Sequence, residues 1–155
     1  MNTTIERIVP APPARVWELW TTSDGIAQWW APEGFRTDVS TLDLRPDCEL
    51  VYTMTAVAPA QVAFMEQNGM PLATESRKRF TEVDEPSRLA YRSLIDFVPD
   101  HEAYEQLTVV DLEPADGGTR VVMTMEPLHD QVWTERLVAG RANELDNLVA
   151  LVAGK

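Results

Sequence analysis

Four of the chain's five tryptophans fall within Val16 to Pro32, a stretch that directly follows the first strand-like segment. Burying one indole ring stabilises a fold by about 2 to 3 kcal/mol, so rings this close together need a large apolar surface to pack against. We therefore interpret Val16 to Pro32 as one wall of the core or cavity that the chain builds.

Size and charge restrict the class of protein. The 155 residues, 45% apolar and 25% charged, are typical of one globular domain spanning 1–155. The formal net charge of -12 argues against nucleic acid and anionic membrane surfaces as partners, because both need clustered Lys and Arg. A single cysteine, Cys48, rules out an internal disulfide and favours a reducing compartment. No run suits a signal peptide or a membrane span, so we expect a cytoplasmic protein.

The N-terminal segments predict a strand followed by two short helices. Thr3 to Val9 is rich in β-branched residues and is stopped by Pro10, which predicts a strand. Apolar residues at helical spacings then predict one helix to about Thr21 and a second helix capped by Ser23 or Asp24.

The middle of the chain alternates with a period of two between clear turn signals, which is typical of an antiparallel meander. The predicted strands are residues 35–44, 48–57, 73–84, 88–97, 103–113 and 118–126. Pro59 to Met70 interrupts them with apolar residues between a proline and a glycine, and we interpret it as a short helix or lid.

Residues 130–152 form the longest helical pattern. Apolar residues spaced three and four apart give it an amphipathic stripe, made of Val138, Ala142, Leu145, Val149 and Val152. A second row beside the stripe contains Trp133, Leu137, Arg141, Leu148 and Leu151. So wide an apolar face predicts a helix lying on a sheet, and the order of elements predicts an α+β fold.

Five motifs in order carry a family resemblance: Ala11 to Trp17, Trp29 to Pro32, Arg45-Pro46, Phe80 to Tyr91 and Gly117 to Arg120. Together they resemble the START-like superfamily, also called SRPBCC, in the branch named for the C-terminal domain of the heat-shock-protein ATPase activator. The resemblance implies a helix-grip fold. In that fold a curved antiparallel sheet of six to seven strands wraps a long C-terminal helix, and two short helices after strand one close a cavity.

The chain departs from the family pattern in three places. Asp47 and Cys48 stand where relatives usually have Gly-Gly, and Met125 stands where the last strand often ends in His. Arg141 follows Gly140 where relatives often have Gly-Trp, which adds a guanidinium to an otherwise apolar row. A relative's ligand therefore does not transfer to this chain.

We expect the cavity to be apolar, with a few phenols that orient a ligand. The candidate ligand contacts are Trp30, Tyr52, Met54, Phe64, Met65, Arg79, Tyr91, Met123, Met125, Trp133, Leu137 and Arg141. The alternative for each apolar member is core filling, the commoner role of an apolar stripe. Trp29 and Trp30 point about 100 degrees apart on a helix, so we expect one on the sheet and the other over the cavity mouth.

Charged residues alternate along segment 73–84 and therefore divide between the two faces of the strand. One face carries Glu75, Arg77 and Arg79, and the other carries Ser76, Lys78 and Phe80. An inward Arg79 would anchor a carboxylate or hydroxyl, or take part in an acid–base site, whereas an outward one would belong to a solvated, paired face. Arg141 is a candidate partner for Glu75 or for a ligand anion.

The sequence shows no nucleophile elbow, Walker loop or dinucleotide fingerprint. His101 and His129 are predicted in loops, 28 residues apart, without the spacing of a helical metal pair. Asp130 beside His129 is better explained as a helix cap. We therefore expect neither a metal nor a cofactor.

Three functions stay open. The first is binding of a small hydrophobic or amphipathic molecule between the sheet and the C-terminal helix, and a homodimer is compatible with it. The second is an enzyme resembling the polyketide cyclases and aromatases of the superfamily. The third is a chaperone-associated protein-interaction domain. An enclosed apolar void would favour ligand binding, and convergent Arg, Glu and Tyr groups would favour an enzyme. An exposed apolar patch would favour the protein-interaction domain.

Overall fold

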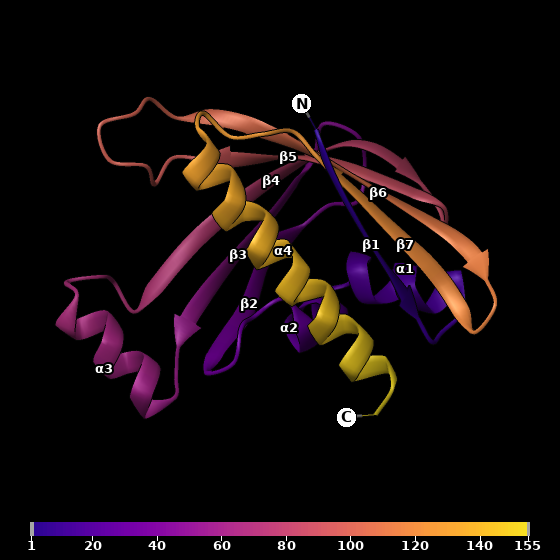
Figure 1. Ribbon diagram of the computed structural model, residues 1–155, viewed down its shortest axis with the longest axis horizontal. Coiled ribbons are helices and arrows are strands. Elements are labelled where there is room, and N and C mark those ends of the chain that lie inside the picture. The colour runs from indigo at the N-terminus through magenta and orange to yellow at the C-terminus, as the bar shows by residue number, and fades with distance from the viewer. Residues whose placement is uncertain (1, 155) are drawn as a thin grey trace.

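The computed structural model describes residues 2–154, in which one curved antiparallel sheet is combined with four helices (Figure 1). The strands are β1 (Thr3–Val9), β2 (Phe35–Leu42), β3 (Glu49–Ala56), β4 (Ala73–Asp84), β5 (Arg88–Ile95), β6 (Tyr104–Ala115) and β7 (Gly118–Met125). The helices are α1 (Pro13–Thr21), α2 (Ser23–Trp29), α3 (Pro59–Gln67) and α4 (Gln131–Val152). The predicted α+β helix-grip fold is confirmed, and every predicted strand ends within two residues of the observed one.

The sheet order is β1-β7-β6-β5-β4-β3-β2, so each strand from β2 to β7 pairs with its neighbour in sequence. β1 joins at the β7 edge, where Val9 lies opposite Thr119. This pairing requires glycine at the β6–β7 turn, because a Cβ at Gly118 would lie 2.0 Å from the Val9 carbonyl oxygen. Gly118 also has a φ of +145°, which side chains rarely adopt.

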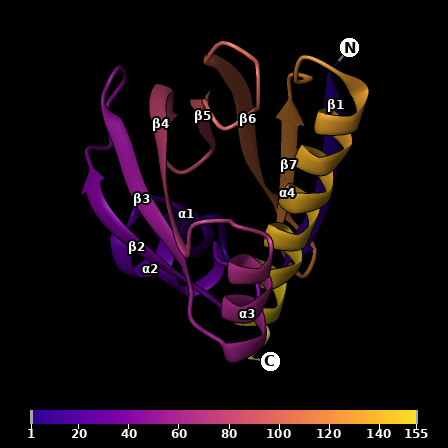
Figure 2. The same cartoon turned by 90° about the vertical axis from the view of Figure 1, so that its left-hand side faces the viewer.

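The sheet curves around helix α4. The register shifts by one residue between Val39 and Thr41 in β2 and between Phe80 and Glu82 in β4, and such bulges bend and twist a strand. In Figure 2 strands β2, β3 and β4 stand on one side, and β7, β1 and α4 stand on the other. The concave face is therefore the face that can hold a site.

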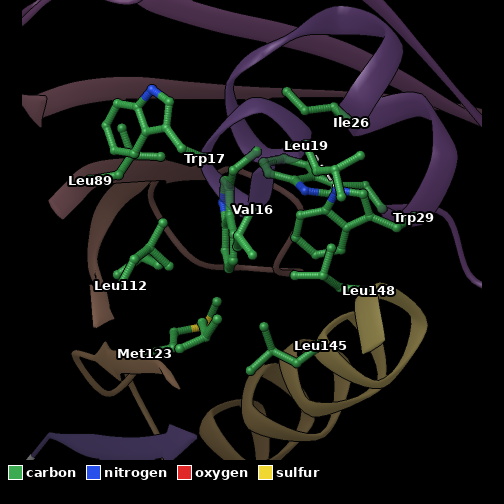
Figure 3. Close-up of a cluster of buried hydrophobic side chains, with 14 of the residues drawn as sticks. Val16, Trp17, Leu19, Ile26, Trp29, Leu89, Leu112, Met123, Leu145 and Leu148 are labelled. Carbon is green, nitrogen blue, oxygen red and sulfur yellow. Dashed lines mark hydrogen bonds between the residues drawn. The ribbon is translucent and has the colours of Figure 1, made fainter. Parts of the chain in front are cut away.

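Helices α1 and α2 bring the tryptophans into the core, as Figure 3 shows for Trp17 and Trp29. All four indoles of Val16 to Pro32 are at most 3% exposed, which confirms that this stretch is a wall of the core. Trp29 Nε1 donates to the Leu19 carbonyl oxygen at 2.8 Å, which joins the two helices. The predicted cap of α2 is wrong by one residue, because Thr22 Oγ1 accepts from the Gly25 amide.

Helix α4 begins at the predicted cap, since Asp130 Oδ1 accepts from the Trp133 amide at 2.8 Å. It runs diagonally across the concave face and packs on β1 and α2 (Figure 1). Leu145 and Leu148 in its second half are fully buried in the core. The first half is only partly buried, so space is left between it and the sheet.

Helix α3 contacts the end of β3 and stands away from the middle of the sheet (Figure 1). It matches the short helix predicted within Pro59 to Met70. None of the helices formed by residues 2–154 combines the length and the hydropathy that a membrane span requires.

Candidate functional site

A cavity of about 220 Å³ lies between β3, β4, β5 and the first half of α4. The sheet lines it with Tyr52, Ser76, Lys78, Ser93 and Ile95, and α4 lines it with Trp133, Arg136, Leu137, Gly140 and Arg141. Pockets that enclose drug-sized molecules usually have volumes of roughly 300 to 1,000 Å³. This cavity therefore suits a smaller molecule.

The alternation of β4 turns a lysine into the cavity. Successive strand residues point to opposite faces, and Lys78 shares the inner face with buried Phe80. In the β4–β5 register Lys78 lies opposite Ser93. Its amine Nζ donates a hydrogen bond to Ser93 Oγ at 2.8 Å. The strand register thus fixes an amine and a hydroxyl side by side on the cavity floor.

Lys78 is enclosed to an unusual degree for a lysine, with only 3% of the residue exposed. Its Nζ lies 5.7 Å from the ring centroid of Trp30, 5.8 Å from that of Tyr52 and 5.1 Å from that of Tyr91. These rings offer their negative faces to a cation. Across residues 2–154 no carboxylate forms an ion pair with this amine.

Burial lowers the pKa of Lys78 to about 7, because the ammonium form loses its hydration. The positive charge of Arg141 lowers the pKa further, and the negative charge of Glu144 partly opposes both effects. Near neutral pH the amine and ammonium forms are therefore both populated. A neutral amine is a nucleophile, which an ordinary surface lysine is not at this pH.

Arg141 reaches the cavity from α4 already paired with Glu144, one turn further along the helix. Burial is the largest effect and acts to lower the pKa of Arg141, but the attraction of Glu144, Tyr52 and Tyr91 and the hydrogen bond to Glu144 together outweigh it, so the pKa stays above its ordinary value. Arg141 does not pair with Glu75, which lies 3.3 Å from Arg77 instead. The guanidinium charge is thus balanced on its own helix.

Two buried phenols lie close to the amine, Tyr52 on the floor and Tyr91 behind it. Burial raises the pKa of Tyr52 to about 12 and holds the pKa of Tyr91 above its ordinary value as well. Both phenols therefore keep their protons at neutral pH. The cavity thus combines an amine, a hydroxyl, a neutral phenol and the balanced guanidinium of Arg141.

The mouth of the cavity is aromatic. Phe97, in the loop after β5, is 56% exposed, and its ring centroid lies 5.9 Å from that of Trp133. The Arg136 guanidinium lies 4.9 Å from the same indole. Leu128 and Leu137 continue this lining, so the walls above the polar floor are mainly apolar, with Arg136 as a charged group among them.

Both histidines meet beside the mouth, although the sequence separates them by 28 residues. The ring centroids of His101 and His129 are 4.3 Å apart, and Tyr104 Oη is hydrogen-bonded to His129 Nδ1 at 2.7 Å. The His129 ring centroid also lies 6.0 Å from that of Trp133. Within residues 2–154 no group of three or more His, Cys, Asp or Glu is arranged to hold a metal ion.

The predicted ligand contacts divide into several groups. Four of them line the cavity, namely Tyr52, Trp133, Leu137 and Arg141. Trp30 and Tyr91 lie behind the floor, against the amine of Lys78. Others lie in or against the core, namely Met54, Met123 and Met125, and Phe64 and Met65 lie on α3, outside the cavity. Trp29 and Trp30 are both buried, so neither covers the mouth as expected.

Arg79 points to the opposite face of the sheet. Its guanidinium lies 2.9 Å from Glu105 and 3.4 Å from Asp47, both exposed carboxylates. Because side chains alternate along β4, an inward Lys78 forces Arg79 outward. The solvated, paired face considered for this strand is the arrangement that the structure adopts.

Sequence patterns did not point to most of the cavity residues, among them Lys78, Ser93 and Gly140. A signal for Lys78 was present, since it alternates in phase with Phe80, an aromatic residue typical of an inner face. Ser93 has no such signal, because its role depends on the register between β4 and β5. Gly140 matters for its open surroundings, since a Cβ built there meets no heavy atom within 4 Å.

Comparison with known proteins supports the fold. The family model described as activator of Hsp90 ATPase homolog 1-like protein matches residues 10–153. A crystal structure of a Chromobacterium violaceum protein is 24% identical, with a TM-score of 0.78, over 97% of this chain and 96% of that one. The solution structure of an AHSA1-like protein from Aeromonas hydrophila is 23% identical, with a TM-score of 0.75, over 99% and 94%. A search of curated proteins gives no match.

Proposed function

The chain belongs to the activator of Hsp90 ATPase homolog 1-like family, and we propose that it binds a small amphipathic molecule in the cavity beneath α4. The observation that carries this proposal is that the cavity lining is polar on its floor and mainly apolar on its walls. The floor holds the polar groups of Lys78, Ser93 and Tyr52, whereas the walls near the mouth are mainly apolar. A molecule with one polar end and a short apolar body matches both parts.

The charges of the floor favour an uncharged polar end. Arg141 is balanced by Glu144, and Lys78 is partly neutral near pH 7. An anionic head on the floor would meet an arginine that is already paired, because Arg136, which has no ion pair among residues 2–154, lies over Trp133 at the mouth. A carbonyl or hydroxyl end can accept or donate hydrogen bonds without a new buried charge.

The walls supply the affinity for the apolar body. Trp133, Leu137 and Ile95 come from both sides of the cavity, so a chain between them is removed from water on two sides. Burial of apolar surface contributes roughly 25 cal/mol per Å². A body of about six carbons is consistent with the modest volume of the cavity, as pockets for larger ligands exceed about 300 Å³.

Gly140 allows a sharp test. It lies on the cavity-lining row of α4 and a side chain added there meets open space, so Gly140→Phe should fill the cavity without a clash. Replacing an interior helical glycine also stabilises a helix by roughly 0.5 to 1 kcal/mol. A loss of binding in this variant therefore cannot be attributed to unfolding.

The experiment measures hexanol binding by calorimetry, with unfolding followed by circular dichroism. We expect the unmodified chain and Gly140→Ala to bind, and Gly140→Phe to lose affinity by about ten-fold or more, which corresponds to 1.4 kcal/mol. The proposal fails if the unmodified chain binds neither hexanol nor its longer homologues. It also fails if Gly140→Phe binds as well as Gly140→Ala, because the alcohol would then lie elsewhere.

A further inference from the structure

We propose that Lys78 captures a small aldehyde or ketone in this cavity as an imine. The inference rests on the proposed function and specifies the polar end of the ligand as a carbonyl group. It depends on three features of the described residues: the place of the amine, the absence of a carboxylate partner and the choice of lysine at this position.

The place of the amine is suitable for a reaction with a bound molecule. Lys78 lines the cavity, and its Nζ is held by the hydrogen bond to Ser93 Oγ at 2.8 Å. A ligand whose apolar body lies between Trp133 and Leu137 would direct its polar end to this floor. Holding two reacting groups in one cavity makes their reaction effectively intramolecular.

The surroundings of the amine offer it aromatic ring faces but no ion-pair partner. A buried lysine is normally retained by an ion pair, yet no carboxylate among residues 2–154 pairs with Lys78. Glu144, the acidic group that acts on it, is hydrogen-bonded to Arg141. The amine is thus the one group of this floor whose burial is not offset by a partner of opposite charge.

The choice of lysine is notable in this sequence. Eleven of its thirteen basic residues are arginines, and the lysines are Lys78 and Lys155. An arginine remains charged in proteins, whereas a buried lysine can lose its proton and become a nucleophile. The position that faces the cavity floor therefore holds the basic residue that can react.

The reaction needs no further reactant. The lone pair of Nζ attacks the carbonyl carbon, the C=O π electrons move to oxygen, and one amine proton moves to that oxygen through solvent or Ser93 Oγ. The resulting carbinolamine loses its hydroxyl with a second amine proton as water, which leaves a C=N bond. The balance is one amine and one carbonyl giving one imine and one water, with no change of oxidation state.

The rings around Nζ favour the product once it carries a positive charge. An imine that takes up a proton becomes an iminium cation at the position where the faces of Trp30, Tyr52 and Tyr91 meet. Cations at such sites gain favourable interaction with the ring quadrupoles, more so where water is excluded.

The test is reductive trapping of hexanal with cyanoborohydride at pH 7, followed by intact mass and peptide mapping. Reduction fixes the imine as an added mass equal to that of hexanal minus one oxygen atom. Cleavage after glutamate releases Ser76–Glu82, in which Lys78 is the sole lysine. Lys155 is the comparison lysine in the same reaction.

We expect the adduct on Lys78 to form about ten-fold faster than the adduct on Lys155, because a lowered pKa increases the fraction of free amine. It should disappear in Lys78→Arg, which keeps the charge, and in Gly140→Phe, which fills the cavity. Lys155→Arg should leave it unchanged. Lys78→Met, an apolar replacement in case the arginine variant does not fold, should remove it as well, with folding checked by circular dichroism.

Two results overturn the inference while leaving the proposed function intact. In the first, the unmodified chain binds hexanol, but hexanal gives no reduced adduct on Ser76–Glu82. In the second, Lys78 and Lys155 are labelled at equal rates. Failure of hexanol itself to bind contradicts the proposed function instead, so the two failures are distinguishable.

Discussion

Lys78 and Ser93 face each other across β4 and β5, with Nζ 2.8 Å from Oγ, and both are buried. The β4–β5 register creates this pair, and the three aromatic rings around Nζ offer no hydrogen-bond acceptor as good as the hydroxyl. The pair therefore connects the stability of the fold with the chemistry of the cavity.

Removing the Ser93 hydroxyl should lower the stability of the fold. Ser93→Ala leaves Nζ without its acceptor, and a hydrogen bond to a charged group contributes about 1.5 to 3 kcal/mol. We expect the free energy of unfolding to fall by roughly 1 to 3 kcal/mol at pH 6, measured by urea denaturation. Ser76→Ala is the matched control, because Ser76 lines the same cavity without bonding to Lys78. Equal losses in both variants would contradict the assigned role of Ser93.

The pH dependence of stability should report on Lys78. The folded state lowers the pKa of Lys78 from 10.5 to about 7 through burial, with Arg141 adding to the effect and Glu144 opposing it. Between these two pKa values the unfolded chain binds more protons than the folded chain. The free energy of unfolding therefore rises as the pH rises through this window and decreases again as the pH falls. Tyr52 and Tyr91 also face the amine, but their raised pKa values keep them neutral below pH 10.

Lys78→Met should therefore be more stable than the unmodified chain at pH 6. The difference should shrink by about 3 to 5 kcal/mol as the pH rises to 10, since each unit of pKa corresponds to 1.36 kcal/mol. Urea denaturation of both proteins at several pH values measures it. A difference that stays constant between pH 6 and 10 would show that Lys78 keeps an ordinary pKa in the folded state.

The charge of the cavity should decide which head groups bind. Glu144→Gln leaves Arg141 without its partner and adds net positive charge near Lys78. We expect the affinity for hexanoate, relative to hexanol, to rise by about ten-fold, or 1.4 kcal/mol. Glu135→Gln is the control, since Glu135 lies on the same helix but is exposed and bonds to Gln131. An unchanged ratio in Glu144→Gln would show that the ion pair does not set charge preference.

Replacing Gly118 or Gly140 by alanine should change the stability of the chain in opposite directions. Gly118→Ala places a Cβ 2.0 Å from the Val9 carbonyl oxygen, at a positive φ, and should destabilise the chain by about 2 kcal/mol or more. Gly140→Ala meets open space in a helix and should stabilise it by roughly 0.5 to 1 kcal/mol. Thermal unfolding of the two variants measures both changes, and a shift of the same sign would refute the assigned packing.

Periodicity predicted most of the fold. The period of two found the strands from β2 to β7, and the helical stripe found α4, because both patterns are local in sequence. The same rule divided β4 into a face with Lys78 and a face with Arg79. It could not say which face turns inward, since that depends on how the whole sheet curves around α4.

The site was predicted less completely for the same reason. Tyr52, Trp133, Leu137 and Arg141 line the cavity as expected, because their rows face the contact between sheet and helix. The contact between Lys78 and Ser93 depends on strand register, and the contact between His101 and His129 depends on the paths of two loops. Neither contact can be predicted from the spacing of residues along the chain.

Helix α4 serves two separate purposes along its length. Its second half fills the core with Leu145 and Leu148, and its first half lines the cavity with Trp133, Leu137 and Gly140. Substitutions in the first half thus meet the cavity and leave those core contacts in place. Within this fold, the lining of the cavity can diverge at one end of a helix while the other end of that helix preserves the architecture.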